Sequence, residues 1–151
     1  MYNYRGFPRK LMINIGVVDL NNMENIKNEM LSKKVWAVVG VTPNKEKFGY
    51  KIYKKLKQSG YTVYPINPKY DEVEGDEIYS RVQDLPEKPQ CINIVVNPRV
   101  ANRTLEDIKE QSIDYVWFQP GTFDDDVIKK AQEYHMEIVY HDCVLVALRK
   151  G

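Results

Sequence analysis

Residues 35–43 read Val-Trp-Ala-Val-Val-Gly-Val-Thr-Pro, an apolar run that ends in a glycine turn. Five apolar residues without a polar interruption are typical of a parallel strand that is buried on both faces. A helix is predicted next, over residues 46–59, because an apolar residue recurs every fourth position at Phe48, Ile52 and Leu56. A strand, a glycine turn and an amphipathic helix are the first half of a βαβ unit.

The rest of the chain repeats this alternation of strand and helix. Strands are predicted over residues 61–66, 91–96, 115–118 and 137–140, and helices over 98–111 and 124–134. Residues 70–76 are predicted as a loop, 78–85 as at most a turn of helix, and 144–150 as either a helix or an extended tail. Crossovers between parallel strands are right-handed. We therefore expect an α/β domain with a three-layer, Rossmann-like, doubly wound sheet of about five parallel strands.

The two ends of the chain are expected to differ in order. Residues 1–22 are predicted to be a weakly ordered extension, and residues 23–151 the folded domain, with a lead-in helix from Met23. The apolar run 11–18 follows basic residues, as in a signal peptide. However, Asn14 interrupts it and no small-residue cleavage pattern comes after it. The run is also too short to span a bilayer.

Composition and charge narrow the class of protein. A chain of 151 residues has the usual size of one domain, and a mean hydropathy of −0.52 argues against a membrane protein. The formal net charge of +1 predicts neither nucleic acid nor a membrane surface as a partner. Cys91 and Cys143 stand in no metal-ligand spacing and indicate free thiols in a reducing compartment. We expect a cytoplasmic protein without a metal site, and the sequence points to no particular protein partner.

Five turns are the candidate ligand positions. In doubly wound sheets, ligands bind beyond the carboxyl ends of the strands, where the strand order reverses. Small, polar and proline residues follow each predicted strand, at 40–44, 67–69, 97–99, 119–121 and 141–143. Turns need such residues for structural reasons also. No single turn therefore defines a site, but five in register indicate a shared crevice.

The turn after the second strand discriminates best between ligands. An NAD-binding fold has Asp or Glu there, which holds the ribose hydroxyls. This chain has Asn67-Pro68-Lys69, without a carboxylate and with a cation that suits a phosphorylated ribose, as in coenzyme A or NADP. The alternative is that Lys69 is a solvated turn lysine. The glycine signature of dinucleotide-binding folds is incomplete, since only Gly40 and Gly49 remain of it.

On these residues the chain resembles the small stand-alone coenzyme A-binding domain proteins, which are similar to the nucleotide-binding domain of the succinyl-CoA synthetase alpha subunit. The resemblance covers residues 33 to about 146 and rests on four segments: 35–43, 60–68, 117–121 and 141–143. The synthetase also needs a second domain with a phosphorylated histidine, for which this chain has no room. The resemblance therefore implies the ligand without the reaction.

The resemblance also implies which residues contact coenzyme A. They are Gly40, Val41 and Thr42 along the phosphates; Asn67, Pro68 and Lys69 near the phosphorylated ribose; Val96, Asn97 and Pro98 beside the adenine or its sugar; and Gln119, Pro120 and Gly121 beside the pantetheine arm. Asn97 departs from the family pattern, because the synthetases often have proline there. From the residues alone, Asn97 and Pro98 also suit the N-cap and first position of a helix.

The leading hypothesis is a non-catalytic domain that binds coenzyme A or an acyl-CoA. Two alternatives stay open: an NADP-dependent or acyl-CoA-using enzyme, and the nucleotide-binding subunit of a larger acyl-CoA ligase. His141, Asp142 and Cys143 are not expected to form a catalytic group, since adjacent residues of an extended segment point to opposite faces. Replacing Gly40 by Val is expected to block the phosphate position and to leave the fold largely intact.

Overall fold

The computed structural model describes residues 10–13 and 16–150. Its strands are β1 Lys10–Ile13, β2 Gly16–Asp19, β3 Val35–Val39, β4 Thr62–Ile66, β5 Glu72–Val73, β6 Asp76–Glu77, β7 Cys91–Ile94, β8 Tyr115–Phe118 and β9 Glu137–Val139. Its helices are α1 Leu20–Ser32, α2 Phe48–Gln58, α3 Pro98–Glu110, α4 Asp125–Glu133 and α5 Val144–Lys150, with a 3-10 turn at Val82–Asp84.

A five-stranded parallel sheet forms the centre of the domain, in the order β4-β3-β7-β8-β9. The chain starts the sheet at β3, adds β4 on one side, and then returns across β3 to add the other three strands. The strand order therefore reverses between β3 and β7, which is the switch point of a doubly wound sheet. The predicted Rossmann-like class is confirmed.

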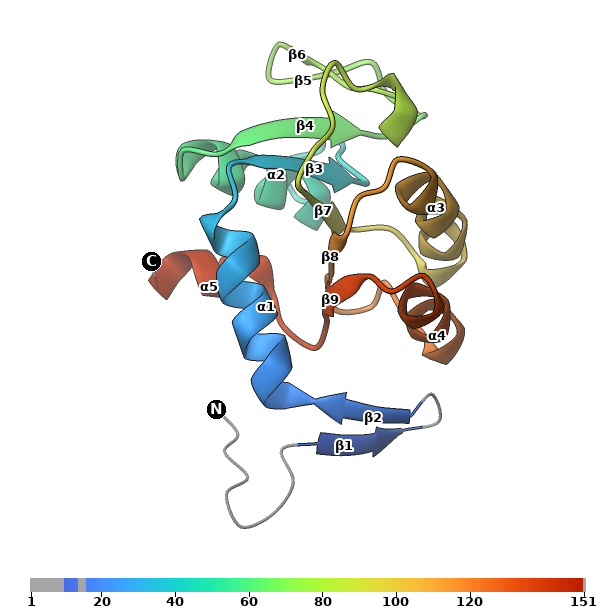
Figure 1. The fold of residues 1–151 in the computed structure, drawn as a ribbon. Helices are drawn as coiled ribbons and strands as arrows, with labels where there is room; N and C mark the ends of the chain where they lie inside the picture. Colours follow the sequence, from blue (N-terminus) through green and yellow to red (C-terminus); the bar gives the residue numbers. More distant parts are fainter. Residues whose placement is uncertain (1–9, 14–15, 151) are drawn as a thin grey trace.

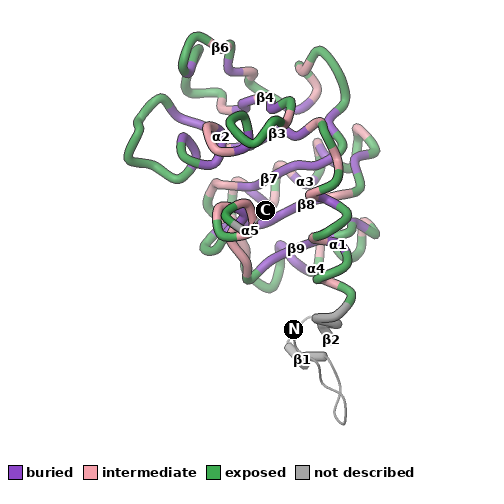
Figure 2. Tube along the Cα trace, turned by 90° about the vertical axis from the view of Figure 1, so that its left-hand side faces the viewer, coloured by how far each residue is buried: buried purple, intermediate pink, exposed green. Residues whose placement is uncertain are grey.

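Helices cover both faces of the sheet, as Figure 1 shows, with α3 and α4 on one side and α1, α2 and α5 on the other. One buried apolar cluster joins Ile92 of the sheet to Leu105 of α3 and Ile128 of α4. A second cluster joins Trp36 to Met30 of α1 and Ile52 of α2. In Figure 2 the central strands are accordingly buried while the outward helix surfaces are exposed.

Pro65 lies inside β4 without interrupting its pairing. A proline has no N–H to donate, yet β4 pairs with β3 as far as Val39↔Ile66. Thr62 donates its N–H to Lys34 and Ile66 accepts from Gly40, so alternate residues of β4 face β3. Pro65 belongs to the other set, and its carbonyl accepts from the N–H of Tyr79 on the outer side. The proline therefore costs the ladder no donor.

The elements differ from the sequence prediction in one added hairpin and in several boundaries. Residues 70–76 contain a short antiparallel hairpin, β5–β6, rather than only a loop. Its turn places Glu74 and Gly75 at φ values of 53° and 82°, the positive φ pair of a tight hairpin turn. Helix α1 begins at Leu20 rather than Met23, and β7 ends at Ile94 rather than Val96.

The N-terminal segment is described in part. Residues 10–13 and 16–19 form an antiparallel two-stranded hairpin, β1–β2, ahead of α1. Residues 1–9 and 14–15 lie outside the described residues, and the weak order expected for 1–22 stays a prediction. Over the described ranges, each helix is too short or too polar to cross a bilayer.

Candidate functional site

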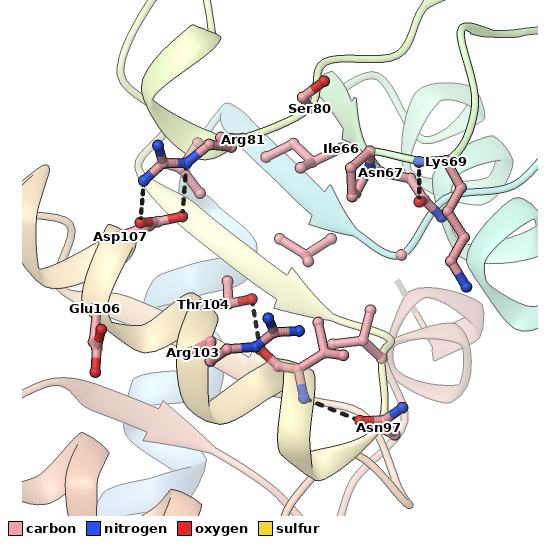
Figure 3. Close-up of a pocket in the computed structure, with 16 residues that line it drawn as sticks. Ile66, Asn67, Lys69, Ser80, Arg81, Asn97, Arg103, Thr104, Glu106 and Asp107 are labelled. Atoms are coloured by element: carbon pink, nitrogen blue, oxygen red, sulfur yellow. Dashed lines mark hydrogen bonds and ion pairs between the residues drawn. The ribbon is translucent and has the colours of Figure 1, made fainter.

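A cavity of about 550 Å³ lies at the switch point, between the carboxyl ends of β4, β3 and β7 and the side of α3. We call it the first cavity (Figure 3). Its apolar part consists of Val39, Ile66, Pro68, Val82, Val96 and Val100, and its polar part of Asn67, Lys69, Ser80, Arg81, Asn97, Arg103, Thr104, Glu106 and Asp107, with Gly40 between them. The volume and the mixture of apolar walls with a few polar groups are typical of small-molecule sites.

The charges that line the first cavity are unequally paired. Asp107 accepts from Arg81 at 2.8 Å, and Glu106 pairs with Lys130 at 2.8 Å, so each acid has its own cation. Burial opposes ionisation of Asp107, but hydrogen bonds from Arg81 and Gln83 outweigh it and lower the pKa of that carboxyl. Among the described residues, Lys69 and Arg103 have no ion-pair partner. The cavity therefore carries uncompensated positive charge and suits an anion.

A second cavity of about 390 Å³ lies beside the first, over the N-terminal end of α2. The two share the wall residues Gly40, Asn67, Lys69 and Val96. The second cavity is otherwise lined by Thr42, Asn44, Lys47, Phe48, Gly49, Tyr70 and Val95. One extended ligand can therefore pass from the first cavity into the second across Gly40.

Gly40 is fixed by the backbone around it. Its φ is 108°, and a Cβ atom there would lie 2.4 Å from the carbonyl oxygen of Val95. The Gly40 N–H donates to Ile66 at 2.8 Å, which holds the turn against β4. The expectation that Gly40→Val leaves the fold largely intact is therefore wrong, because the added side chain meets backbone rather than open space.

Gly49 is the second glycine of the incomplete signature, and its role is close packing. A Cβ atom at Gly49 would lie 2.1 Å from the carbonyl oxygen of Gly40. The first turn of α2 therefore rests directly on the turn after β3. This contact corresponds to the helix–strand packing glycine of dinucleotide-binding folds.

Val41 and Thr42 contribute unequally to the site. Val41 is fully buried, and its carbonyl accepts from Nδ2 of Asn67 at 2.9 Å, so it faces the core rather than either cavity. Thr42 lines the second cavity and accepts from the Asn44 N–H through its hydroxyl at 3.1 Å. Its hydroxyl proton can still be donated to a ligand.

Asn67 ties two of the predicted site turns together. Its amide donates to Val41, and its Oδ1 accepts from the Lys69 N–H at 2.9 Å. Asn67, Pro68 and Lys69 all line the first cavity, and Lys69 is exposed. The side chain of Asn67 therefore shapes the turn, while Lys69 is the group available to a ligand.

The turn after β7 begins α3 as predicted. Asn97 is the N-cap, with Oδ1 accepting from the Val100 N–H at 3.0 Å, and Pro98 occupies the start of the helix. Val96 and Asn97 line the first cavity, whereas Pro98 is not among its wall residues. Capping therefore explains Asn97 without a ligand, and its contact with adenine or ribose stays a prediction.

Gln119 is used inside the protein. The residue is only 4% exposed, and its Oε1 accepts from the Val144 N–H at 3.0 Å and from Asn93 at 3.3 Å. Its Nε2 donates to Sγ of Cys143 at 3.1 Å. Gln119, Pro120 and Gly121 line neither the first nor the second cavity.

The last predicted turn, 141–143, is also occupied by internal contacts. Asp142 pairs with Lys27 of α1 at 2.7 Å, and its carbonyl accepts from Nε1 of Trp117. The other thiol, Cys91, is buried, and burial raises its pKa to about 12. Within the described ranges, no group of three His, Cys, Asp or Glu side chains could hold a metal ion.

Sequence reasoning missed the contribution of α3 to the site. Arg103, Thr104 and Asp107 line the first cavity from within the helix, well past the predicted turn at 97–99. A helical stripe could have revealed Thr104 and Asp107, because Asn97, Val100, Thr104 and Asp107 recur at intervals of three and four residues. Figure 3 shows Asn97, Thr104 and Asp107 of this stripe, with the Arg103 guanidinium extending along the wall of the cavity.

The fold defines the chain as a Rossmann-like domain, and the cavity at its switch point carries excess positive charge. A family model described as a CoA binding domain matches residues 34–149. The chain belongs to this CoA binding domain family.

Individual relatives differ in size. The alpha subunit of acetate–CoA ligase (ADP-forming) II from Pyrococcus furiosus is 29% identical over 119 residues, which cover 72% of this chain and 26% of that subunit. The chain thus spans about a quarter of the length of that relative. The uncharacterized protein YneT of Bacillus subtilis is 22% identical, with 81% of this chain and 90% of YneT covered. A solved structure of a hypothetical protein from Pyrococcus horikoshii OT3 has a TM-score of 0.79 and 31% identity, and covers 99% of this chain and 98% of that one.

Proposed function

We propose that this chain binds coenzyme A, or a thioester of it, at the switch point, as a binding domain rather than a catalyst. The observation that carries the proposal is the uncompensated positive charge of the first cavity. Lys69 and Arg103 have no ion-pair partner among the described residues, while both acids in the wall are paired. A nucleotide with more phosphoryl groups than NAD matches this charge best.

The apolar part of the first cavity suits the base of the nucleotide. Val39 and Ile66 are buried and Val100 is half-buried at the wall of this cavity, where they can cover a flat ring. NAD-binding folds have a carboxylate at the end of the second strand, which holds the ribose hydroxyls. At the end of β4 this chain has Asn67 instead. The ribose is therefore expected to carry its phosphate toward Lys69.

The comparisons support the same ligand. The matched family is described as a CoA binding domain, and several relatives are ligases whose names include CoA. YneT and the protein from Pyrococcus horikoshii are close to this chain in length, which supports a domain that acts without the rest of a ligase.

A thermal-shift panel tests the proposal with the full chain. A ligand that binds only the folded state raises the melting temperature in proportion to RT ln(1 + [L]/Kd). Coenzyme A at a hundred times its Kd should add about 2.7 kcal/mol of stability, NADP should add little, and NAD should add none. Stabilisation by NADP alone would instead favour an oxidoreductase. A stabilising effect of NAD with none from coenzyme A would contradict the proposal outright.

A further inference from the structure

Two exposed aromatic side chains line the second cavity. Phe48 is 62% exposed and Tyr70 is 40% exposed, and the remaining large exposed hydrophobic residue of the described chain is Val146, on α5 at 38%. Phe48 packs only loosely, with the Lys51 ammonium 5.8 Å from its ring centroid. Exposed rings gathered at the wall of a cavity mark a place where an apolar group binds.

The same cavity also attracts anions. Lys47 and Lys69 line it, and within the described residues neither has an ion-pair partner. The cavity covers the start of α2, an 11-residue helix whose first N–H groups have no intrahelical acceptor. A ligand that fits this cavity therefore has an anionic group followed at short range by an apolar one.

Coenzyme A has this order of groups. Its diphosphate is bonded to a pantoyl unit that carries two methyl groups on one carbon, and the amides and the thiol come after it. The first cavity holds the nucleotide in the proposed function, and the shared wall at Gly40 connects it to the second. The diphosphate would then lie at the start of α2, which brings the dimethyl carbon toward the exposed rings.

Resting on that proposed function, we propose that Phe48 and Tyr70 bind the pantoyl segment and direct the pantetheine arm out over the start of α2. This route differs from the one past Gln119, Pro120 and Gly121 that the resemblance implied. Gln119 is occupied by Asn93, Cys143 and Val144, which leaves that turn with little to offer the arm. Phe48 and Tyr70 are thus the residues that select a nucleotide with an apolar arm over one without it.

Calorimetric titration of the full chain separates the arm from the nucleotide. The two probes are coenzyme A and adenosine 3′,5′-bisphosphate, which has the phosphorylated nucleoside but no arm. Phe48→Ala should raise the Kd of coenzyme A about fivefold to tenfold, and adding Tyr70→Ser should raise it further. The Kd of the bisphosphate should change less than about twofold in both variants.

Two control variants fix the interpretation. Val146→Ala removes exposed apolar surface outside the cavity and should change neither Kd, whereas Pro120→Ala tests the other route. Loss of coenzyme A affinity in Pro120→Ala with none in Phe48→Ala would overturn the inference, as would equal losses for both probes in Phe48→Ala. If wild-type protein binds neither probe, the proposed function fails and this inference fails with it.

Discussion

The turns after β4 and β8 were both predicted to contact the ligand, and the structure uses them in opposite ways. The turn after β4 presents Lys69 to solvent and to both cavities. The turn after β8 directs Gln119 inward, where its amide connects β7 to the start of α5. Both turns have a polar residue, a proline and a third residue in a similar pattern, so their sequences do not separate them.

The structure that packs against the end of each strand explains the difference. Strands β4 and β8 each lie one strand away from the switch point, since β4 pairs with β3 and β8 pairs with β7. The end of β4 borders both cavities through Asn67 and Lys69, whereas the start of α5 packs against the end of β8, where the Val144 N–H donates to Gln119. The turn after β4 is therefore open to a ligand, while Gln119 in the turn after β8 is engaged by internal hydrogen bonds.

The largest expected effect is on stability, at two glycines with positive φ: Gly40 in the turn after β3 and Gly121 in the turn after β8. Gly40→Val should destabilise the protein by about 3 kcal/mol or more, because the side chain meets the Val95 carbonyl at backbone level. Gly121→Ala should cost only about 1–2 kcal/mol, since a Cβ there has open space and only the backbone conformation is unfavourable. Urea unfolding measures both. Equal losses would mean that the two turns are packed alike.

A smaller effect should distinguish Lys69 from Gln119. Lys69→Ala should raise the Kd of coenzyme A about tenfold and that of its 3′-dephospho form about twofold, with stability unchanged, because it removes one charged contact to the ribose phosphate. Titration calorimetry with both ligands measures this. An equal loss for the two ligands would show that Lys69 does not contact that phosphate.

Gln119→Leu is the matched control for Lys69→Ala. It should lower the free energy of unfolding by about 2 kcal/mol, because the Val144 N–H and the Asn93 amide lose their partner while buried. Coenzyme A affinity should be nearly unchanged at temperatures where the variant is folded. A large loss of affinity without a loss of stability would place Gln119 in the site after all.

The smallest effect concerns how each turn is held. The β5–β6 hairpin follows Lys69 in the chain and is attached to α2 through two carboxylates. Lys54 and Tyr50 donate hydrogen bonds to Glu74, and Lys57 and Tyr53 donate to Asp76. These hydrogen bonds, chiefly those from the lysines, lower the pKa of both carboxyls from their usual 4.5 and 3.8. Their stabilisation is fully present above about pH 5 and is lost as the pH falls through the lowered values.

Hydrogen exchange at pH 6 and pH 3 tests this difference between the two turns. After correction for intrinsic rates, amides of residues 70–78 should lose protection at pH 3, while those of 119–122, held by neutral groups, should keep it. The variant Asp76→Asn should show a smaller change between the two pH values. A uniform change in both segments would indicate global loosening instead.

The sheet and its helices could be predicted because each segment follows one period. The run Val35–Val39 and the helical stripe of Phe48, Ile52 and Leu56 point to the same βαβ unit, and the structure agrees. The β5–β6 hairpin was missed because its strands have two residues each, too short for an alternation to show. Its turn also requires positive φ at Glu74, which is unusual for a residue with a side chain.

The site was predictable only where the chain leaves a strand. Gly40, Asn67 and Lys69 follow strands and were found, whereas Arg103 lies inside α3 and was not. Nothing in the local sequence separates an arginine that lines a cavity from one on a solvated helix face. The packing of α3 beside β7 places Arg103 in the wall of the cavity, and the local sequence does not show that packing.

Pro65 and Tyr79 together have a consequence for how this protein meets other chains. The outer side of β4 would ordinarily offer a row of free amides and carbonyls to any passing strand. Here Pro65 has no N–H to donate, and its carbonyl already accepts a hydrogen bond from the Tyr79 N–H. The Asn67 N–H already donates to the Tyr79 carbonyl. Addition of a further strand is therefore hindered at this end of β4, directly before the turn that presents Lys69.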